Sequence, residues 1–167
     1  MAERHFEEPL RLLFVEDYEP MFELLRDDLL ESATFPIEVV GANSLTLAEC
    51  MLQQTIMPSH TLCNRFEESL SRDFVSSDSF DSFVLPETRY AIDLVLSDLT
   101  LPDCCGVATV ERLRKAAVRR PILILTSWDD GVLFAQCEAA GADICRVKGR
   151  TNGQELISLI EQLVICN

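Results

Sequence analysis

The sequence predicts a single α/β domain in which helices cover both faces of a parallel sheet. Short apolar runs of strand length alternate with amphipathic segments of helical period along most of the 167 residues. The apolar runs lack the polar alternation of a half-exposed strand, which is typical of parallel strands buried on both faces. With 48% hydrophobic residues, the chain can bury one good core but is short for two domains. Strand-helix alternation of this kind favours right-handed crossovers.

The first part of the chain supplies two strands and two helices. Residues 1–9 form a charged leader, and we expect strands at Leu10–Val15 and Ile37–Val40. Apolar residues at helical spacing predict helices at Glu19–Leu30 and Leu45–Gln54. A turn over residues 41–44 separates the second strand from the second helix, and its Ser44 is able to cap that helix.

Between residues 55 and 89 the periodicity breaks down. Serines, acids and scattered phenylalanines follow one another without a sustained helical or strand period, apart from one or two helical turns at Arg65–Leu70. A long irregular connection inside a compact domain indicates a functional loop, an added element or a flexible segment. We interpret residues 55–89 as an insertion between the second helix and the third strand.

The remaining residues continue the alternation. Strands are expected at Ile92–Leu96, Ile122–Leu125 and Ala142–Val147, and helices at Val107–Ala117, Val132–Ala140 and Gln154–Val164. Pro102 holds Leu101 out of the helical region, so Thr100–Cys105 is predicted to be a loop. In that loop Asp103 is a better candidate for a helix cap than Asp98, which stays at the carboxyl end of an interior strand.

Four of the five predicted strands end in an ionic or hydroxyl side chain. Because parallel strands present their carboxyl ends at one edge, we expect these side chains to converge there: Glu16, Asp17, Asp98, Thr126 and Lys148. Each has an ordinary explanation alone, as a solvated loop acid, a capping hydroxyl or a surface charge. Together, clustered carboxylates raise one another's proton affinity unless a cation neutralises them. An all-oxygen site of this kind suits Mg²⁺ or Mn²⁺, with Lys148 as a mobile positive charge opposite.

Composition restricts the partners and the compartment. A formal net charge of −14 makes direct binding to nucleic acid or to an anionic membrane surface unfavourable. The N-terminus lacks the basic-then-apolar build of a signal peptide, and no apolar run approaches membrane-spanning length, so we expect a cytoplasmic protein. The seven cysteines contain no C-x-x-C pair and only two histidines accompany them, which predicts that most of the cysteines are small core residues in a reducing compartment rather than zinc ligands.

Four motifs together resemble the receiver domains of two-component response regulators. They are FVED at Phe14–Asp17, LVLSDLTLPD at Leu94–Asp103, LILTS at Leu123–Ser127 and GADICRVK at Gly141–Lys148. The resemblance covers almost the whole chain except the leader and the insertion. It implies a flavodoxin-like fold with strand order 2-1-3-4-5.

The resemblance also implies a role for each residue of the motifs. Asp98 corresponds to the aspartate that accepts a phosphoryl group from a histidine kinase or a phosphotransfer protein. Asp17 would bind Mg²⁺ directly, Glu16 would act through water, and the backbone carbonyl of Thr100 would complete the protein ligands. Lys148 and Thr126 would contact the phosphoryl oxygens. Such a domain is not an enzyme beyond its own phosphorylation and dephosphorylation.

Two positions depart from the family pattern and put the usual output in doubt. Cys145 stands where members usually have Tyr or Phe, and Gly149 stands where they usually have Pro. Trp128 and Phe134 are the nearby aromatic residues able to replace the missing switch ring, so the switch candidates are Trp128, Phe134 and Cys145. A homodimer through the last helices and strand is a further option for the output surface.

Three other classes of protein share parts of this pattern. A haloacid-dehalogenase-type phosphatase wants a second acid two residues after the nucleophile, where this chain has Thr100. A flavodoxin needs a Ser/Thr/Gly-rich phosphate loop, and the acidic sequence after the first strand is unsuited to phosphate. A phosphorylation-independent interaction module is the main alternative. No effector segment is recognisable before Asn167, so we expect a single-domain regulator or the receiver part of a longer protein.

Overall fold

The computed structural model describes residues 9–54 and 91–165. One parallel sheet contains β1 (Leu10–Val15), β2 (Ile37–Ala42), β3 (Leu94–Ser97), β6 (Ile122–Thr126) and β7 (Ile144–Val147). A small antiparallel ladder contains β4 (Thr100–Leu101) and β5 (Cys104–Cys105). The helices within these ranges are α1 (Glu19–Ser32), α2 (Leu45–Gln54), α3 (Val107–Ala117), α4 (Gly131–Ala139) and α5 (Gly153–Ile165).

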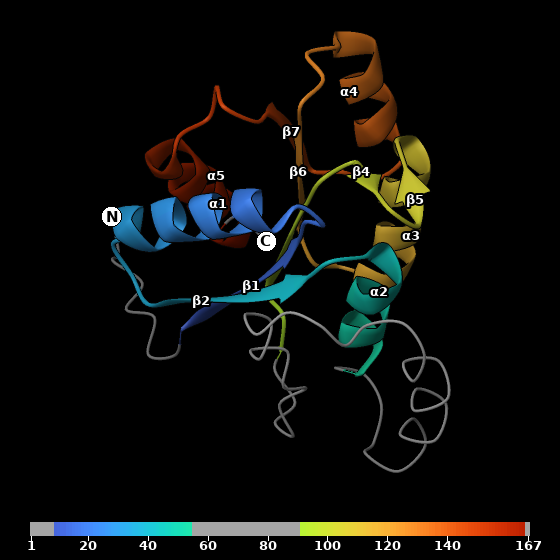
Figure 1. Ribbon diagram of the computed structural model, residues 1–167. Coiled ribbons are helices and arrows are strands. Elements are labelled where there is room, and N and C mark those ends of the chain that lie inside the picture. Colours follow the sequence, from blue (N-terminus) through green and yellow to red (C-terminus); the bar gives the residue numbers. More distant parts are fainter. Residues whose placement is uncertain (1–8, 55–90, 166–167) are drawn as a thin grey trace.

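The parallel sheet has the strand order β2-β1-β3-β6-β7. This confirms the predicted order 2-1-3-4-5, since β4 and β5 lie outside the sheet and only shift the numbering. The helices form two outer layers, with α1 and α5 on one face and α2, α3 and α4 on the other (Figure 1). The fold is therefore the flavodoxin-like three-layer sandwich expected from the sequence.

Two apolar clusters hold the layers together, one on each face of the sheet. Alternate residues of β1 go to opposite clusters, because successive side chains of a strand point to opposite faces. Leu12 and Phe14 pack with the α1 and α5 side, and Leu13 and Val15 pack with the α2 and α3 side. β1 and β3 lie in the interior of the sheet, so each is hydrogen-bonded to a strand on both sides, and the residues that follow them start from fixed positions.

The structure corrects two of the predicted boundaries. β2 continues through Gly41 and Ala42, which were predicted to begin a turn, because these residues stay in register with Phe14 and Val15 of β1. Thr100–Cys105, predicted to be a loop, instead forms the β4–β5 hairpin. The predicted Ser44 cap is confirmed, since the Ser44 hydroxyl accepts a hydrogen bond from the Leu47 amide at 3.3 Å.

Asp103, predicted to be a helix cap, caps a different helix from the one that directly follows it in the sequence. It sits at the tip of the β4–β5 hairpin and its carboxylate accepts hydrogen bonds from Leu45 and Thr46, at the start of α2. The helix that directly follows the hairpin, α3, begins after Gly106 without a side-chain cap. Asp103 is thus a helix cap, but of a helix that lies far away in sequence.

Some predictions fall outside the described residues. The leader up to residue 8 and the insertion at residues 55–89 belong to this group. In the two described ranges, none of the helices combines the length and the apolar character needed to cross a bilayer. The five described cysteines are free thiols, but only Cys137 and Cys145 are buried, so the expectation that most cysteines are core residues is wrong for the described ones; Cys50 and Cys104 are partly buried and Cys105, in the β4–β5 hairpin, is exposed.

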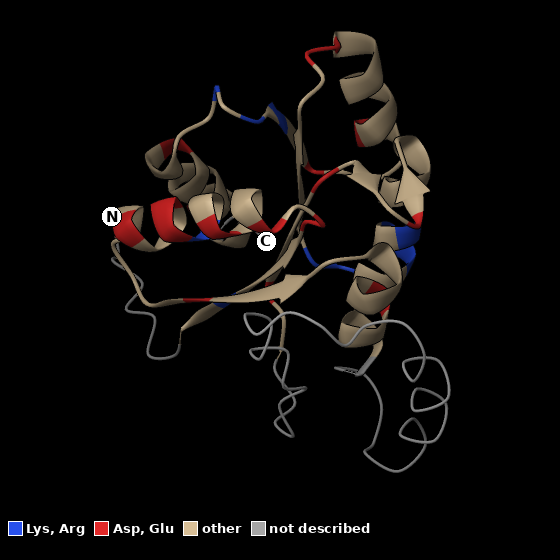
Figure 2. Cartoon of the chain, in the orientation of Figure 1, with Lys and Arg blue, Asp and Glu red and all other residues tan. Residues whose placement is uncertain are grey.

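Charge is unevenly distributed over the described elements. Figure 2 shows acidic residues along α1 and basic residues on β7 and the loop that follows it. The acids of α1 are Glu19, Glu23, Asp27, Asp28 and Glu31. A polyanion approaching this side would meet like charge along the helix.

Candidate functional site

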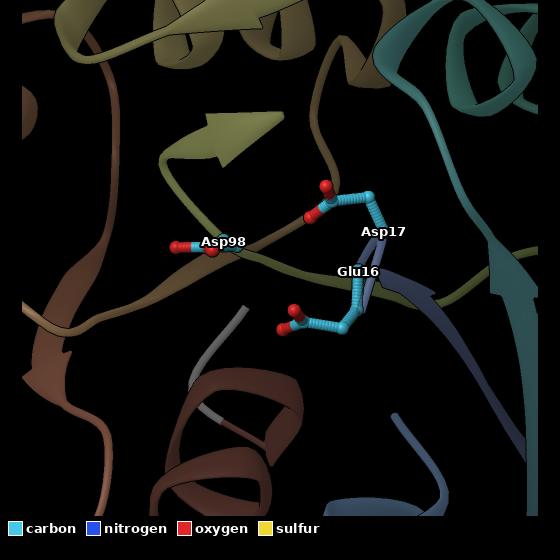
Figure 3. A group of neighbouring side chains, drawn as sticks. All are labelled: Glu16, Asp17 and Asp98. Carbon is cyan, nitrogen blue, oxygen red and sulfur yellow. The ribbon is translucent and has the colours of Figure 1, made fainter. Parts of the chain in front are cut away.

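Three carboxylates meet at the carboxyl edge of the sheet. Glu16 and Asp17 directly follow β1, and Asp98 directly follows the neighbouring strand β3. Each offers a carboxylate oxygen, and these oxygens lie within 4.8 Å of one another. Figure 3 shows the three side chains reaching from the two strand ends toward the same region. Glu16 and Asp98 are buried, whereas Asp17 is exposed.

The backbone around Asp98 is fixed by its neighbours. The Asp98 amide donates to the Val15 carbonyl at 2.9 Å, which continues the pairing of β3 with β1. One carboxylate oxygen, Oδ1, accepts a hydrogen bond from the Leu99 amide at 2.6 Å. The other, Oδ2, lies 2.9 Å from Nζ of Lys148. Both oxygens therefore have defined partners at the end of a rigid strand.

Lys148 joins two of the acids. Its Nζ donates to Oε2 of Glu16 at 2.6 Å as well as facing Asp98, and its backbone amide donates to the Thr126 carbonyl at 2.8 Å. The side chain is only 7% exposed. It is thus a buried and paired cation rather than the mobile charge that the sequence suggested.

The electrostatics of Glu16 follow from this burial. Desolvation raises the pKa of the Glu16 carboxyl above its ordinary value of 4.5, although Lys148 lowers it, and the charge of Asp98 adds to the increase. Burial is the main cause, because removal from water disfavours the charged form of the carboxyl more than Lys148 stabilises it. Three carboxylates share this edge with the single ammonium group of Lys148, which is paired with Glu16 and Asp98.

Thr126 ends β6, next to β3 in the sheet, and is buried. Its hydroxyl oxygen accepts a hydrogen bond from the Trp128 amide at 3.2 Å. The Trp128 side chain is 64% exposed. Thr100, whose carbonyl was predicted to be a ligand, begins β4 two residues after Asp98.

The three switch candidates occupy different environments. Cys145 on β7 is buried beside Cys137 in the cluster between the sheet and α2, α3 and α4. Burial raises the pKa of its thiol to about 12, so it is an inert apolar residue. Phe134 packs against the same cluster and is partly buried. Trp128 is the exposed candidate, and it is the one with a backbone link to Thr126.

Gly149, which follows Lys148, has a φ angle of +76°. This is the left-handed region, which glycine adopts without steric cost and proline cannot adopt, because its ring holds φ near −65°. The second departure from the family pattern is therefore built into the backbone of this turn.

The donor set fits a small divalent cation. Mg²⁺ and Mn²⁺ prefer carboxylate, carbonyl and water oxygens, and the cluster supplies three carboxylates without histidine or thiolate. Glu16 carries an elevated pKa that a cation would lower. Both the chemistry of the donors and their excess charge are those of a metal site.

The family model for the response regulator receiver domain matches residues 73–161, more than half of the chain. This chain belongs to the response regulator receiver domain family. Receiver domains are phosphoacceptor signalling domains of two-component systems, rather than classical enzymes, and they interact with histidine kinases or phosphotransfer proteins. The matched residues include Asp98, Thr126 and Lys148. No curated protein sequence gives a match.

Solved receiver structures share the fold over nearly the whole chain. A LuxR-family two-component response regulator from Aurantimonas sp. SI85-9A1 has a TM-score of 0.65 at 18% identity, covering 96% of this chain and 88% of the other. The phosphorylated cyanobacterial phytochrome response regulator RcpA has a TM-score of 0.62 at 17% identity, covering 95% of each chain. The Mn(2+)-bound form of response regulator Rcp1 has a TM-score of 0.61 at 19% identity, covering 92% and 93%.

Proposed function

We propose that this receiver domain accepts a phosphoryl group on Asp98 from a histidine kinase or a phosphotransfer protein, with Mg²⁺ or Mn²⁺ held beside it. The observation that carries the proposal is the position of Lys148, whose ammonium group lies 2.9 Å from Oδ2 of Asp98. A buried carboxylate at a strand end, beside one fixed cation and two further acids, combines a nucleophile with sites for positive charge. Phosphoryl transfer requires little else of a protein.

In the proposed step an oxygen of Asp98 attacks the phosphorus atom of a phosphohistidine. The new bond joins this oxygen to phosphorus, the phosphorus–nitrogen bond breaks, and its electron pair returns to the imidazole of the donor. Lys148 offsets negative charge on the transferring group, as the carboxylate of Asp98 becomes an acyl phosphate. A divalent cation, when bound, supplies further positive charge at the phosphoryl oxygens.

The ligand roles are assigned within the same proposal. Asp17, which is exposed, and Asp98 bind the cation directly, Glu16 acts through water, and the Thr100 carbonyl completes the protein ligands. The similarity to the Mn(2+)-bound form of Rcp1 and to phosphorylated RcpA supports, by analogy, a divalent cation and a phosphoryl group at this site. A cytoplasmic location belongs to the proposal as well, since free thiols at all five described cysteines are typical of a reducing compartment.

The proposed output begins at Thr126. Its hydroxyl hydrogen-bonds a phosphoryl oxygen on Asp98, which draws the Trp128 loop inward and alters a partner surface or a homodimer surface formed by α4, β7 and α5. Trp128 and Phe134 are the proposed moving side chains. A phosphorylation-independent interaction module is the second candidate, and the observation that favours it is Cys145, which is fully packed where a switch ring would need space.

The test is phosphorylation by acetyl phosphate in the presence of Mg²⁺, followed by intact-mass measurement. Wild type is expected to gain the mass of one phosphoryl group, removable by hydroxylamine as expected for an acyl phosphate, and Asp98→Asn is expected to gain none. Asp93→Asn, at an exposed acid just before β3, is the matched control and should be labelled like wild type. Equal labelling of wild type and Asp98→Asn would contradict the assignment.

A further inference from the structure

The hairpin that follows Asp98 is attached to a helix from a distant part of the sequence. Asp103 lies at its tip, between β4 and β5. Oδ1 of Asp103 accepts a hydrogen bond from the Leu45 amide at 2.9 Å. Oδ2 accepts from the Thr46 amide at 2.8 Å and from the Thr46 hydroxyl at 2.6 Å. One carboxylate thus joins the hairpin to the first turn of α2.

These bonds take over much of the capping of α2. The Ser44 hydroxyl accepts one long hydrogen bond, from the Leu47 amide. Asp103 accepts hydrogen bonds from the amides of Leu45 and Thr46, which have no partner within the helix. Partial burial raises the pKa of the Asp103 carboxyl, but the hydrogen bonds from Thr46 and Leu45 outweigh this effect and the pKa is lowered. The carboxylate is therefore charged near neutral pH and lies at the positive end of the helix dipole.

Both ends of the hairpin are held. At its base, the Leu99 carbonyl accepts hydrogen bonds from the Gly106 amide at 2.8 Å and from the Thr109 hydroxyl of α3 at 3.1 Å. At its tip, Asp103 connects it to α2. The two helices are themselves joined, because the Arg112 guanidinium donates to both carboxylate oxygens of Glu49, at 2.9 and 2.6 Å.

We propose that Asp103 is a positioning residue for the phosphoacceptor site, which acts by tying the backbone of Thr100 and its hairpin to the rigid α2–α3 pair. This inference rests on the proposed function, since it concerns the loop that contributes Asp98 and the Thr100 carbonyl to the metal. A cation that needs several oxygens at once binds less tightly when one of them is no longer held in place. By linkage, metal binding also stabilises the first turn of α2.

Asp103→Ala and Ser44→Ala form a matched pair, because each removes a cap of α2 and only the first releases the hairpin. Both are expected to lower the melting temperature. Asp103→Ala is expected to weaken Mn²⁺ binding, measured by isothermal titration calorimetry, by up to about tenfold, the lower end of the loss seen when a group that directly holds a metal ligand is removed, because Asp103 acts on Thr100 only through the hairpin backbone. Ser44→Ala should bind Mn²⁺ like wild type.

Two further variants grade the effect. Asp103→Asn keeps one acceptor oxygen, so its affinity for Mn²⁺ should lie between those of Asp103→Ala and wild type. Thr46→Val removes only the hydroxyl bond, so it should give a smaller loss of affinity and allows the test even if Asp103→Ala does not fold. Hydrogen exchange supplies a separate readout. Mg²⁺ should slow exchange at the backbone amides of residues 45 and 46 in wild type, and should slow it less in Thr46→Val.

The outcomes separate the two proposals. A wild type that binds no Mn²⁺ would overturn the proposed metal site and this inference with it. A wild type that binds Mn²⁺, with folded Asp103 and Thr46 variants that bind it equally well, would overturn the positioning role alone. Equal losses in Ser44→Ala and Asp103→Ala would show that Asp103 acts only as a helix cap.

Discussion

The ammonium nitrogen of Lys148 lies 2.6 Å from Oε2 of Glu16, and the two side chains are 7% and 2% exposed. Removing one partner of a buried pair leaves an uncompensated charge. Lys148→Ala should therefore lower the free energy of unfolding of the metal-free protein by about 3 to 5 kcal/mol. Saturating Mg²⁺ should restore part of the loss, because it replaces positive charge at the same acids. Chemical denaturation with and without Mg²⁺ measures both effects.

Arg150→Ala is the control for this prediction. Arg150 is also a cation near the end of β7, but its side chain is 70% exposed in an ion pair with Asp129. Its loss should change stability by less than about 1 kcal/mol, with no dependence on Mg²⁺. If Lys148→Ala behaved in the same way, the buried pair would not be a source of stability.

A second prediction concerns pH. The pKa of Glu16 is raised in the folded protein, so the native state binds a proton more readily than the unfolded state above pH 4.5, its ordinary value. The stability that Glu16 contributes is thus fully present below that pH and is lost as pH rises through the folded pKa. Glu16→Gln should make the free energy of unfolding of the metal-free protein depend less steeply on pH, which denaturant unfolding at a series of pH values measures. An unchanged slope would assign the pH dependence to other acids.

The third prediction concerns the proposed output. The Trp128 amide donates to the Thr126 hydroxyl, and the indole is the only one in the chain. If Thr126 turns toward a phosphoryl oxygen, Trp128 must move, so beryllofluoride with Mg²⁺ should change its fluorescence. Thr126→Ala should abolish the change while leaving Asp98 able to be phosphorylated. Unaltered fluorescence and unaltered solution mass, with Asp98 occupied, would favour the phosphorylation-independent module.

The fourth prediction concerns the missing ring. Cys145 is 2% exposed in a packed cluster, so Cys145→Tyr must displace its neighbours. Overpacking of this kind costs about 1 to 3 kcal/mol, to be measured by denaturant unfolding. Arg146→Tyr, at the next and exposed position of β7, should change stability by no more than about 0.5 kcal/mol. A stable Cys145→Tyr would show that this part of the core yields more easily than its packing suggests.

The ends of the strands could be predicted because the signal for each lies in a few consecutive residues. The apolar run before Asp98 and the run before Glu16 each show where a buried strand stops, and parallel strands share an edge. The sequence could not show that Lys148 would face Glu16 more closely than Asp98, since that depends on side-chain geometry across 132 positions. The amides that Asp103 accepts from lie 58 and 57 positions away in sequence, at Leu45 and Thr46, so rules that consider only neighbouring residues could not predict them. The β4–β5 hairpin could not be predicted, because strands of two residues are too short to show an alternation of apolar and polar residues.

The glycine after Lys148 makes exchange between glycine and proline at this turn sterically asymmetric. A chain with proline at this position can exchange it for glycine at little steric cost, and the backbone is then free to adopt the φ of +76° found here. The reverse exchange is blocked, because proline would first require the turn to be rebuilt. Gly149→Pro would therefore require a rearranged backbone after Lys148, whereas glycine is compatible with both conformations of the turn.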